Sequence, residues 1–155
     1  MTNFWKNKKV LITGDTGFKG SWLTCILLNL GCCVKGISLE PDETNLLYNS
    51  LMEDKIFLKF LRENIYIHDD IDIRNEDKLK ESILDFNPEV IFHLAAQPLV
   101  RESYIKPKLT WETNVIGSIN LLESVRHLNE CSVIMVTTDK VYQTTSSKHG
   151  FNEDD

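Results

Sequence analysis

The 155-residue sequence lacks the features that mark membrane, metal-binding and nucleic-acid-binding proteins. No segment approaches the length of an apolar membrane span, and residues 1–9 contain no signal-type apolar core. The four cysteines include no C-x-x-C pair and the four histidines are scattered, so we expect free thiols and no metal site. Acidic residues outnumber basic ones 23 to 17, and the net charge of −6 gives no general attraction to nucleic acid or anionic lipid. We therefore expect a cytoplasmic protein without a nucleic-acid or membrane partner.

Glycine is also scarce, and its distribution is uneven. Of only seven glycines, three lie in one short segment as Gly14, Gly17 and Gly20, between an apolar run and a helical pattern. Elsewhere, short apolar runs alternate with longer helical patterns, which is typical of βαβ units. The sequence predicts an α/β fold with a doubly wound, parallel, Rossmann-like sheet whose crossovers are right-handed. Predicted strands are 9–13, 33–38, 65–68, 90–95 and 132–137, and predicted helices are 17–30, about 51–61, 75–86 and about 107–128.

The glycine segment has the chemistry of a phosphate site. In a doubly wound fold, the first strand-to-helix turn directs helix amides and the positive end of the helix dipole above the sheet. Gly14 permits the tight turn, Gly17 lets the backbone approach a phosphate, and Gly20 lets the helix pack closely. This context, after a strand and before a helix, favours a dinucleotide site over a merely tight turn.

Three neighbouring residues leave questions open. Lys19 places a cation in the first turn of a helix, where it opposes the helix dipole. Either an anion bound nearby compensates for this charge, or the lysine is exposed to solvent and its small cost is tolerated. Asp15 places a carboxylate in the same turn, and its effect depends on which way its side chain points. The second strand ends at Ser38, where an NAD site has an acid, and Glu40 is a candidate displaced by two positions. Because no arginine follows that strand, we expect NAD rather than NADP.

Several longer stretches carry a family resemblance. They are VLITGDTGFKGSWL at 10–23, DIR at 72–74, HLAAQPLVRESY at 93–104, TNVIGSINLLE at 113–123 and VTTDKVY at 136–142. With them the chain resembles the extended short-chain dehydrogenases/reductases and, within that superfamily, the CDP-glucose 4,6-dehydratases. The lysine of the glycine turn and the Gln-Pro-Leu-Val-Arg run are the discriminating features. The resemblance covers essentially the whole chain but only the amino-terminal part of such an enzyme.

The resemblance implies an enzyme that uses NAD to remove water from a nucleotide sugar. Asp72 and Ile73 would border the adenine, Ala95 and Ala96 would line the path beside the nicotinamide ribose, and Asn114 would organise the site through its backbone. The full set of predicted cofactor-binding residues is Gly14, Thr16, Gly17, Phe18, Lys19, Gly20, Ser38, Glu40, Asp72, Ile73, Leu94, Ala95, Ala96, Gln97 and Asn114.

The predicted catalytic residues are Thr138, Asp139 and Lys140. By the resemblance, Thr138 assists a tyrosine at the sugar, while Asp139 and Lys140 match the acid and base of the elimination. A carboxylic acid can protonate a departing hydroxyl, and a lysine whose pKa is depressed can accept the proton from C5. These residues follow the fifth strand, and ligands of open α/β sheets bind at the carboxyl ends of strands.

One expected pair is missing. The superfamily's Tyr-x-x-x-Lys does not occur after the fifth strand, and the literal match from Tyr104 to Lys108 is interrupted by Pro107. We therefore expect residues 1–155 to be an incomplete dinucleotide-binding domain without its substrate domain, inactive or weakly binding alone and prone to association. A homodimer is expected at full length. Alternatives are a nucleotide-sugar epimerase or reductase, and a non-catalytic NAD(P)-sensing module.

Overall fold

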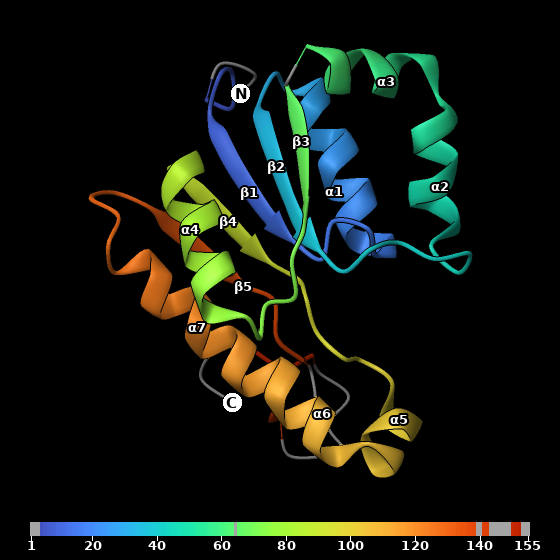
Figure 1. The fold of residues 1–155 in the computed structure, drawn as a ribbon, viewed down its shortest axis with the longest axis vertical. Coiled ribbons are helices and arrows are strands. Elements are labelled where there is room, and N and C mark those ends of the chain that lie inside the picture. Colours follow the sequence, from blue (N-terminus) through green and yellow to red (C-terminus); the bar gives the residue numbers. More distant parts are fainter. Residues whose placement is uncertain (1–3, 64, 139–140, 143–149, 153–155) are drawn as a thin grey trace.

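Parallel strands form the centre of the molecule. A computed structural model describes residues 4–63, 65–138, 141–142 and 150–152. Within them, a five-stranded sheet has the order β3-β2-β1-β4-β5, and each neighbouring pair is parallel (Figure 1). The predicted doubly wound α/β fold with five strands is therefore confirmed. The strands are β1 (Lys9–Thr13), β2 (Cys33–Ser38), β3 (Tyr66–Asp70), β4 (Val90–His93) and β5 (Ser132–Met135).

Helices cover both faces of this sheet. One face carries α1 (Phe18–Asn29), α2 (Leu46–Glu53) and α3 (Lys55–Arg62), and the other carries α4 (Glu76–Phe86) and α7 (Gly117–Val125) (Figure 1). Alternate residues of β1 belong to the two cores. Val10 and Ile12 pack in the core with residues of α1, α2 and α3, whereas Leu11 packs in the other core with residues of α4 and α7. Both faces are buried, which explains why the strands read as continuous apolar runs.

Two predicted helices were wrong in their limits. The helix expected at about 51–61 is two helices, because the side chain of Asp54 accepts hydrogen bonds from the amides of Ile56 and Phe57 and starts α3 afresh. The helix expected at about 107–128 begins with α6 (Pro107–Trp111), continues through the π-helical turn η1 (Glu112–Ile116) and ends with α7. A short helix before it, α5 (Val100–Ile105), was not predicted.

Other limits differ by a few residues. β1 and β2 have their predicted limits, α1 and α4 begin one residue late, and α1 ends one residue early. β3 starts one residue later than predicted and ends two later, while β4 and β5 each end two residues early. Asn75 caps α4 by accepting from the Lys78 amide, and Asn87 ends it in the left-handed region.

Side-chain exposure does not follow the apolar pattern in α1, and the cysteines differ in burial. In α1, the apolar residues Trp22 and Ile26 are each 52% exposed, and the buried face is made largely of small residues, namely Gly20, Ser21 and Thr24 with Leu27 and Leu28. All four cysteines are free thiols, but only Cys32 is fully buried.

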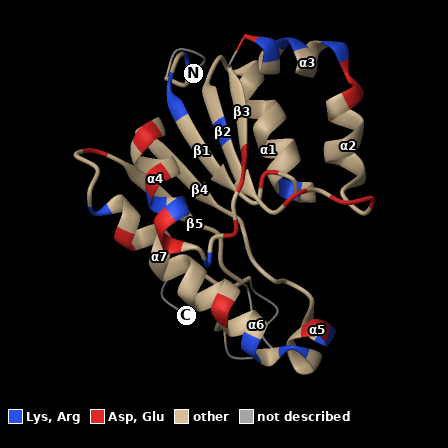
Figure 2. Cartoon of the chain, viewed as in Figure 1, with Lys and Arg blue, Asp and Glu red and all other residues tan. Residues whose placement is uncertain are grey.

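Charge is spread over the outside of the fold. Figure 2 shows basic and acidic residues interspersed along α3, α4 and the helices near the carboxyl end. Among the residues that the structure describes, no cluster of His, Cys, Asp or Glu has the arrangement of a metal site. In the same part of the chain, no helix is long and apolar enough to cross a membrane.

Candidate functional site

The glycine turn lies where β1, β4 and β5 end together. Gly14 has a φ of +78°, and a Cβ at this position would lie 2.8 Å from the amide nitrogen of Ala95, which follows β4. A Cβ on Gly20 would lie 2.7 Å from the Cα of Asp15, so the first turn of α1 can close onto the segment before it only with glycine there. The turn and the segment after β4 therefore form one edge of the sheet.

The backbone amides at the amino end of α1 have no side-chain acceptor from the helix or its N-cap. Gly17 occupies the N-cap position and supplies no side-chain hydrogen bond, and the first turn contains no acid. The amides of Phe18, Lys19 and Gly20 belong to the first helical turn, where backbone donors have no intrahelical partner. Phe18 and Lys19 are exposed, and within the described residues no ion pair of Lys19 occurs. This arrangement is suited to an anion.

The side chain of Asp15 points away from this helix end. It is fully buried, and its Oδ2 accepts hydrogen bonds from Tyr66 Oη at 2.5 Å and His68 Nδ1 at 2.8 Å, both from β3. The carboxylate therefore lies beneath the turn and not among its free amides, which answers the question left open by the sequence.

The end of β2 presents hydroxyl groups. Ser38 Oγ donates to Thr16 Oγ1 at 3.0 Å, and both residues are buried. The side-chain amide of Asn45 donates to the Thr16 carbonyl oxygen at 3.0 Å and so ties the turn to the start of α2. Glu40 lies two residues beyond the strand and is exposed. Thr16 and Ser38 are therefore brought together, whereas Glu40 is not part of this contact.

The segment after β4 is held by a π-helical turn. The Gln97 amide donates to Asn114 Oδ1 at 2.7 Å, and Asn114 Nδ2 donates back to the Gln97 carbonyl oxygen at 3.1 Å. Nearer the glycine turn, the Ala95 amide donates to Thr13 Oγ1. Leu94 and Ala95 are half-buried and Ala96 is exposed. Asn114 thus anchors the segment that follows β4 to η1, and π-helical turns are frequent at functional sites.

His93 completes this support and was not among the predicted site residues. Its Nδ1 lies 2.6 Å from Thr13 Oγ1 and its Nε2 lies 3.0 Å from Ser118 Oγ. Since the Ser118 hydroxyl donates to the Asn114 carbonyl oxygen, Ser118 Oγ accepts from Nε2–H, and Nδ1 accepts from Thr13. Burial lowers the pKa of His93, which agrees with this neutral tautomer. The signal in the sequence was a histidine ending a buried apolar strand.

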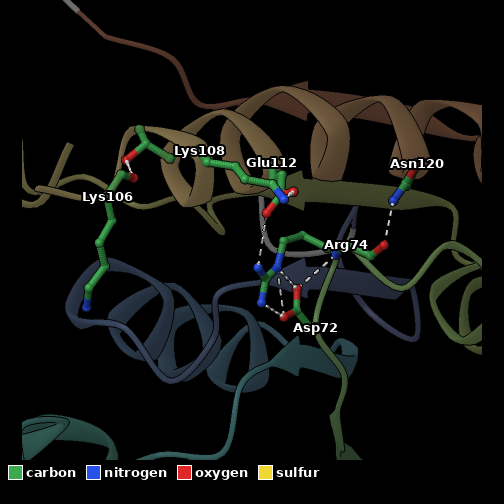
Figure 3. A network of polar contacts seen from close by, with 7 residues as sticks. Asp72, Arg74, Lys106, Lys108, Glu112 and Asn120 are labelled. Atoms are coloured by element: carbon green, nitrogen blue, oxygen red, sulfur yellow. Dashed lines mark hydrogen bonds and ion pairs between the residues drawn. The ribbon is translucent and has the colours of Figure 1, made fainter. Parts of the chain in front are cut away.

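Asp72 and Ile73 follow β3, whose carboxyl end lies at the same end of the parallel sheet as those of β1, β4 and β5. Asp72 accepts hydrogen bonds from Arg74 Nε at 2.9 Å and 3.0 Å, and Arg74 lies between Asp72 and Glu112 (Figure 3). The guanidinium of Arg74 holds the pKa of Asp72 below its usual range. The Ile73 side chain is buried against Gly117, and the side-chain Nδ2 of Asn120 donates to the Ile73 carbonyl oxygen. Any contact of Ile73 with a ligand would therefore use its backbone.

The predicted catalytic residues are only partly described. Thr138 is exposed and follows β5, at the same sheet edge as the glycine turn. Asp139 and Lys140 lie outside the described residues. Tyr104 is 84% exposed in α5, whereas Lys108 lies in α6 and pairs with Glu112. Since two separate helices carry them, Tyr104 and Lys108 do not form the helical Tyr-x-x-x-Lys arrangement.

The sequence over 11–155 matches the family model described as GDP-mannose 4,6 dehydratase. The chain belongs to this family. The extended-dehydrogenase resemblance inferred from the glycine turn and the segments after β4 and β5 is thereby confirmed.

A dehydratase relative and two solved epimerase structures each match most of this chain. CDP-glucose 4,6-dehydratase of Salmonella typhimurium is 42% identical over 99% of this chain, which corresponds to 40% of the relative. The structure of epimerase Mth375 from Methanothermobacter thermautotrophicus has a TM-score of 0.79 at 24% identity, covers 99% of this chain and 42% of its own, and supports the fold alone. UDP-glucose 4-epimerase of Thermus thermophilus in complex with NAD is 28% identical, with a TM-score of 0.60, over 76% of this chain and 33% of its own. The chain thus spans about two fifths of its relatives' length.

Proposed function

We propose that this chain is the NAD-binding amino-terminal part of a nucleotide-sugar dehydratase that converts CDP-glucose to CDP-4-keto-6-deoxyglucose. One observation carries the proposal: the uncapped amino end of α1 follows a glycine turn and faces the sheet edge at which β4 and β5 also end. The 42% identity to a CDP-glucose 4,6-dehydratase supports this substrate over others of the family.

The described residues fit a dinucleotide. A Cβ at Gly17 would meet only the Gly14 carbonyl oxygen, at 3.2 Å, so the backbone of the turn is open to a phosphate. The free amides of Phe18, Lys19 and Gly20 would bind the pyrophosphate, with the Lys19 ammonium group as a further positive charge. Hydride transfer from the sugar and back to it is the chemistry that NAD supplies when bound.

The hydroxyl groups of Ser38 and Thr16 at the end of β2 are compatible with NAD, although the acid that usually binds the ribose of NAD is absent from this position. Ser38 and Thr16 would bind a ribose hydroxyl, and no arginine follows β2 to neutralise a 2′-phosphate. The Asp72 carboxylate already accepts hydrogen bonds from the Arg74 guanidinium. Next to the adenine, Asp72 would therefore make a rigid packing contact.

Residues beyond β5 would carry the elimination. Oxidation at C4 acidifies the C5 proton, so one group must remove this proton while another protonates the departing C6 hydroxyl. We assign these roles to Lys140 and Asp139, and to Thr138 the support of a tyrosine at the sugar. Asn114 and His93 would position the segment after β4, through Gln97 and Thr13 respectively.

Product analysis of the protein at its natural length tests this function. With NAD and CDP-glucose, we expect a product lighter by one water and no net NADH. Asp139→Asn should abolish water loss, while Asp85→Asn, an exposed substitution on α4, should leave turnover unchanged. A product of unchanged mass would instead identify an epimerase, and turnover of GDP-mannose but not CDP-glucose would correct the substrate. Binding of NAD without any product would identify a sensing module.

A further inference from the structure

The carboxylate of Asp15 is buried in an unusual place. Asp15 follows Gly14 in the glycine turn, yet its side chain extends across β2 to β3 and is 0% exposed. It passes directly over Gly36 of β2, where any Cβ would overlap the carboxylate. Because Gly36 has no side chain, it leaves the space through which the Asp15 side chain reaches β3.

Two donors from β3 converge on one oxygen of this carboxylate. Tyr66 Oη lies 2.5 Å and His68 Nδ1 lies 2.8 Å from Oδ2. Tyr48 of α2 lies beside both donors, with its hydroxyl 3.3 Å from that of Tyr66 and its ring centroid 5.7 Å from that of His68. We call Asp15, Tyr66, His68 and Tyr48 the Asp15 cluster.

The Asp15 cluster is not arranged for maximal stability. Within the described residues, Asp15 Oδ1 and His68 Nε2 are buried without a hydrogen-bond partner. A buried polar atom left unpaired destabilises the folded state, and such exceptions concentrate where a protein serves a function.

The turn itself has two other anchors. The Gly14 amide donates to the Ile37 carbonyl oxygen at 2.8 Å, and Ser21 Oγ donates to the Asp15 carbonyl oxygen at 2.9 Å. These bonds hold the main chain on either side of the Asp15 Cα, and the side chain adds a third attachment, to β3. Three attachments in different directions fix the orientation of the peptide planes between Gly14 and Gly17.

We infer that Tyr66 and His68 are positioning residues of the dinucleotide site: by holding the Asp15 carboxylate beneath the turn, they fix the backbone whose amides face the phosphates. The inference rests on the proposed NAD binding for its functional meaning. Its mechanical part, the ordering of the turn by β3, is measurable without NAD.

Amide hydrogen exchange of residues 14–20, together with NAD titration by calorimetry, tests the inference. Tyr66→Phe removes one donor with little change of volume, and we expect about tenfold faster exchange in the turn and about tenfold weaker NAD binding. His68→Leu should behave likewise, whereas His68→Asn, whose amide nitrogen can replace Nδ1, should restore both values to within about threefold of the wild type.

Ser82→Ala provides a matched control. Ser82 is buried and donates to Asp69 Oδ2 at 2.6 Å on the opposite face of β3, so its loss destabilises the same strand without touching the turn. Exchange at 14–20 and NAD affinity should stay at wild-type values in this variant. Equal effects of Ser82→Ala and Tyr66→Phe would overturn the inference, as would unchanged exchange in both Tyr66→Phe and His68→Leu. Faster exchange with no NAD heat from the wild type would refute the proposed function and support the positioning of the turn.

Discussion

Asp15 and Asp69 are two carboxylates on opposite faces of the sheet: Asp15 is held by side chains of β3, and Asp69, itself in β3, is held by Lys35 of β2 and Ser82 of α4. Asp69 Oδ2 lies 2.7 Å from Lys35 Nζ and accepts from Ser82, and its side chain is 30% exposed. Asp15 is fully buried, its partners are a phenol and an imidazole, and among the described residues its Oδ1 has no hydrogen-bond partner. The difference shows that the Asp69 cluster (Asp69, Lys35 and Ser82) neutralises a buried lysine, while the Asp15 cluster holds a turn in place.

Gly36→Ala should have the largest effect of the substitutions that separate the two clusters. The new Cβ overlaps the Asp15 carboxylate, which Tyr66 and His68 prevent from moving, so we expect a loss of about 3 kcal/mol in the free energy of unfolding. In an Asp15→Gly background, the same substitution should cost less than about 1 kcal/mol because the obstacle is gone. Urea unfolding of the four proteins measures this coupling, and additive losses would show that the contact with Asp15 is not the cause.

Asp69→Asn should destabilise the fold without altering the turn. It leaves Lys35, whose side chain is 7% exposed, without an anionic partner, and we expect a loss of about 2 kcal/mol in urea unfolding. NAD affinity should remain within about twofold of the wild type, because Asp69 faces α4 and not the glycine turn. Weaker NAD binding in this variant would mean that the two clusters are coupled through β3.

Ser82→Ala should have a smaller effect of the same kind. It removes one hydrogen bond to Asp69 and leaves the pair with Lys35 intact, so the free energy of unfolding should fall by about 1 kcal/mol. Asp85→Asn on the exposed side of α4 is the control and should change it by less than about 0.5 kcal/mol. A loss as large as that of Asp69→Asn would show that Ser82, and not Lys35, dominates the cluster.

The smallest effects are those of pH, and they have opposite signs. Burial lowers the pKa of His68, but the hydrogen bond and charge of Asp15, with the charges of Asp70 and Asp69, outweigh it and raise the pKa overall. The His68 contribution is therefore complete below the ordinary histidine pKa of about 6.5 and is lost as pH rises through the folded-state value. The difference in unfolding free energy between wild type and His68→Asn should shrink as pH rises.

Asp69 should behave in the opposite way. Burial favours its neutral form, but Lys35 and Ser82 outweigh this and hold the pKa of Asp69 below its usual value. Its contribution is present above the unfolded aspartate pKa of about 3.9 and is lost as pH falls through the folded-state value. The destabilisation caused by Asp69→Asn should accordingly decrease in acid, and a constant difference between pH 3 and pH 7, measured by urea unfolding, would contradict the role of this ion pair.

Local patterns predicted the elements well and the contacts poorly. β1, β2, α1 and α4 were predicted closely because apolar runs, caps and glycine stops act within a few residues. The division of α2 from α3 at Asp54 was missed because a cap residue inside an apolar pattern looks like an ordinary helix position. His93 was missed because its partners Thr13 and Ser118 come from two other elements.

By itself, the sequence determined the parallel α/β architecture, the glycine turn after the first strand and the likeness to nucleotide-sugar dehydratases. These features depend on periodicity, on residue types at short spacing and on motifs, all of which are local. Only the tertiary structure decided the direction of Asp15, the pairing of Thr16 with Ser38 and the anchoring of Gln97 by Asn114. Each of these contacts joins residues at least 17 positions apart. The order of the strands brings Asp15 to β3 and Thr16 to the end of β2, and the packing of η1 beside the segment after β4 brings Asn114 to Gln97.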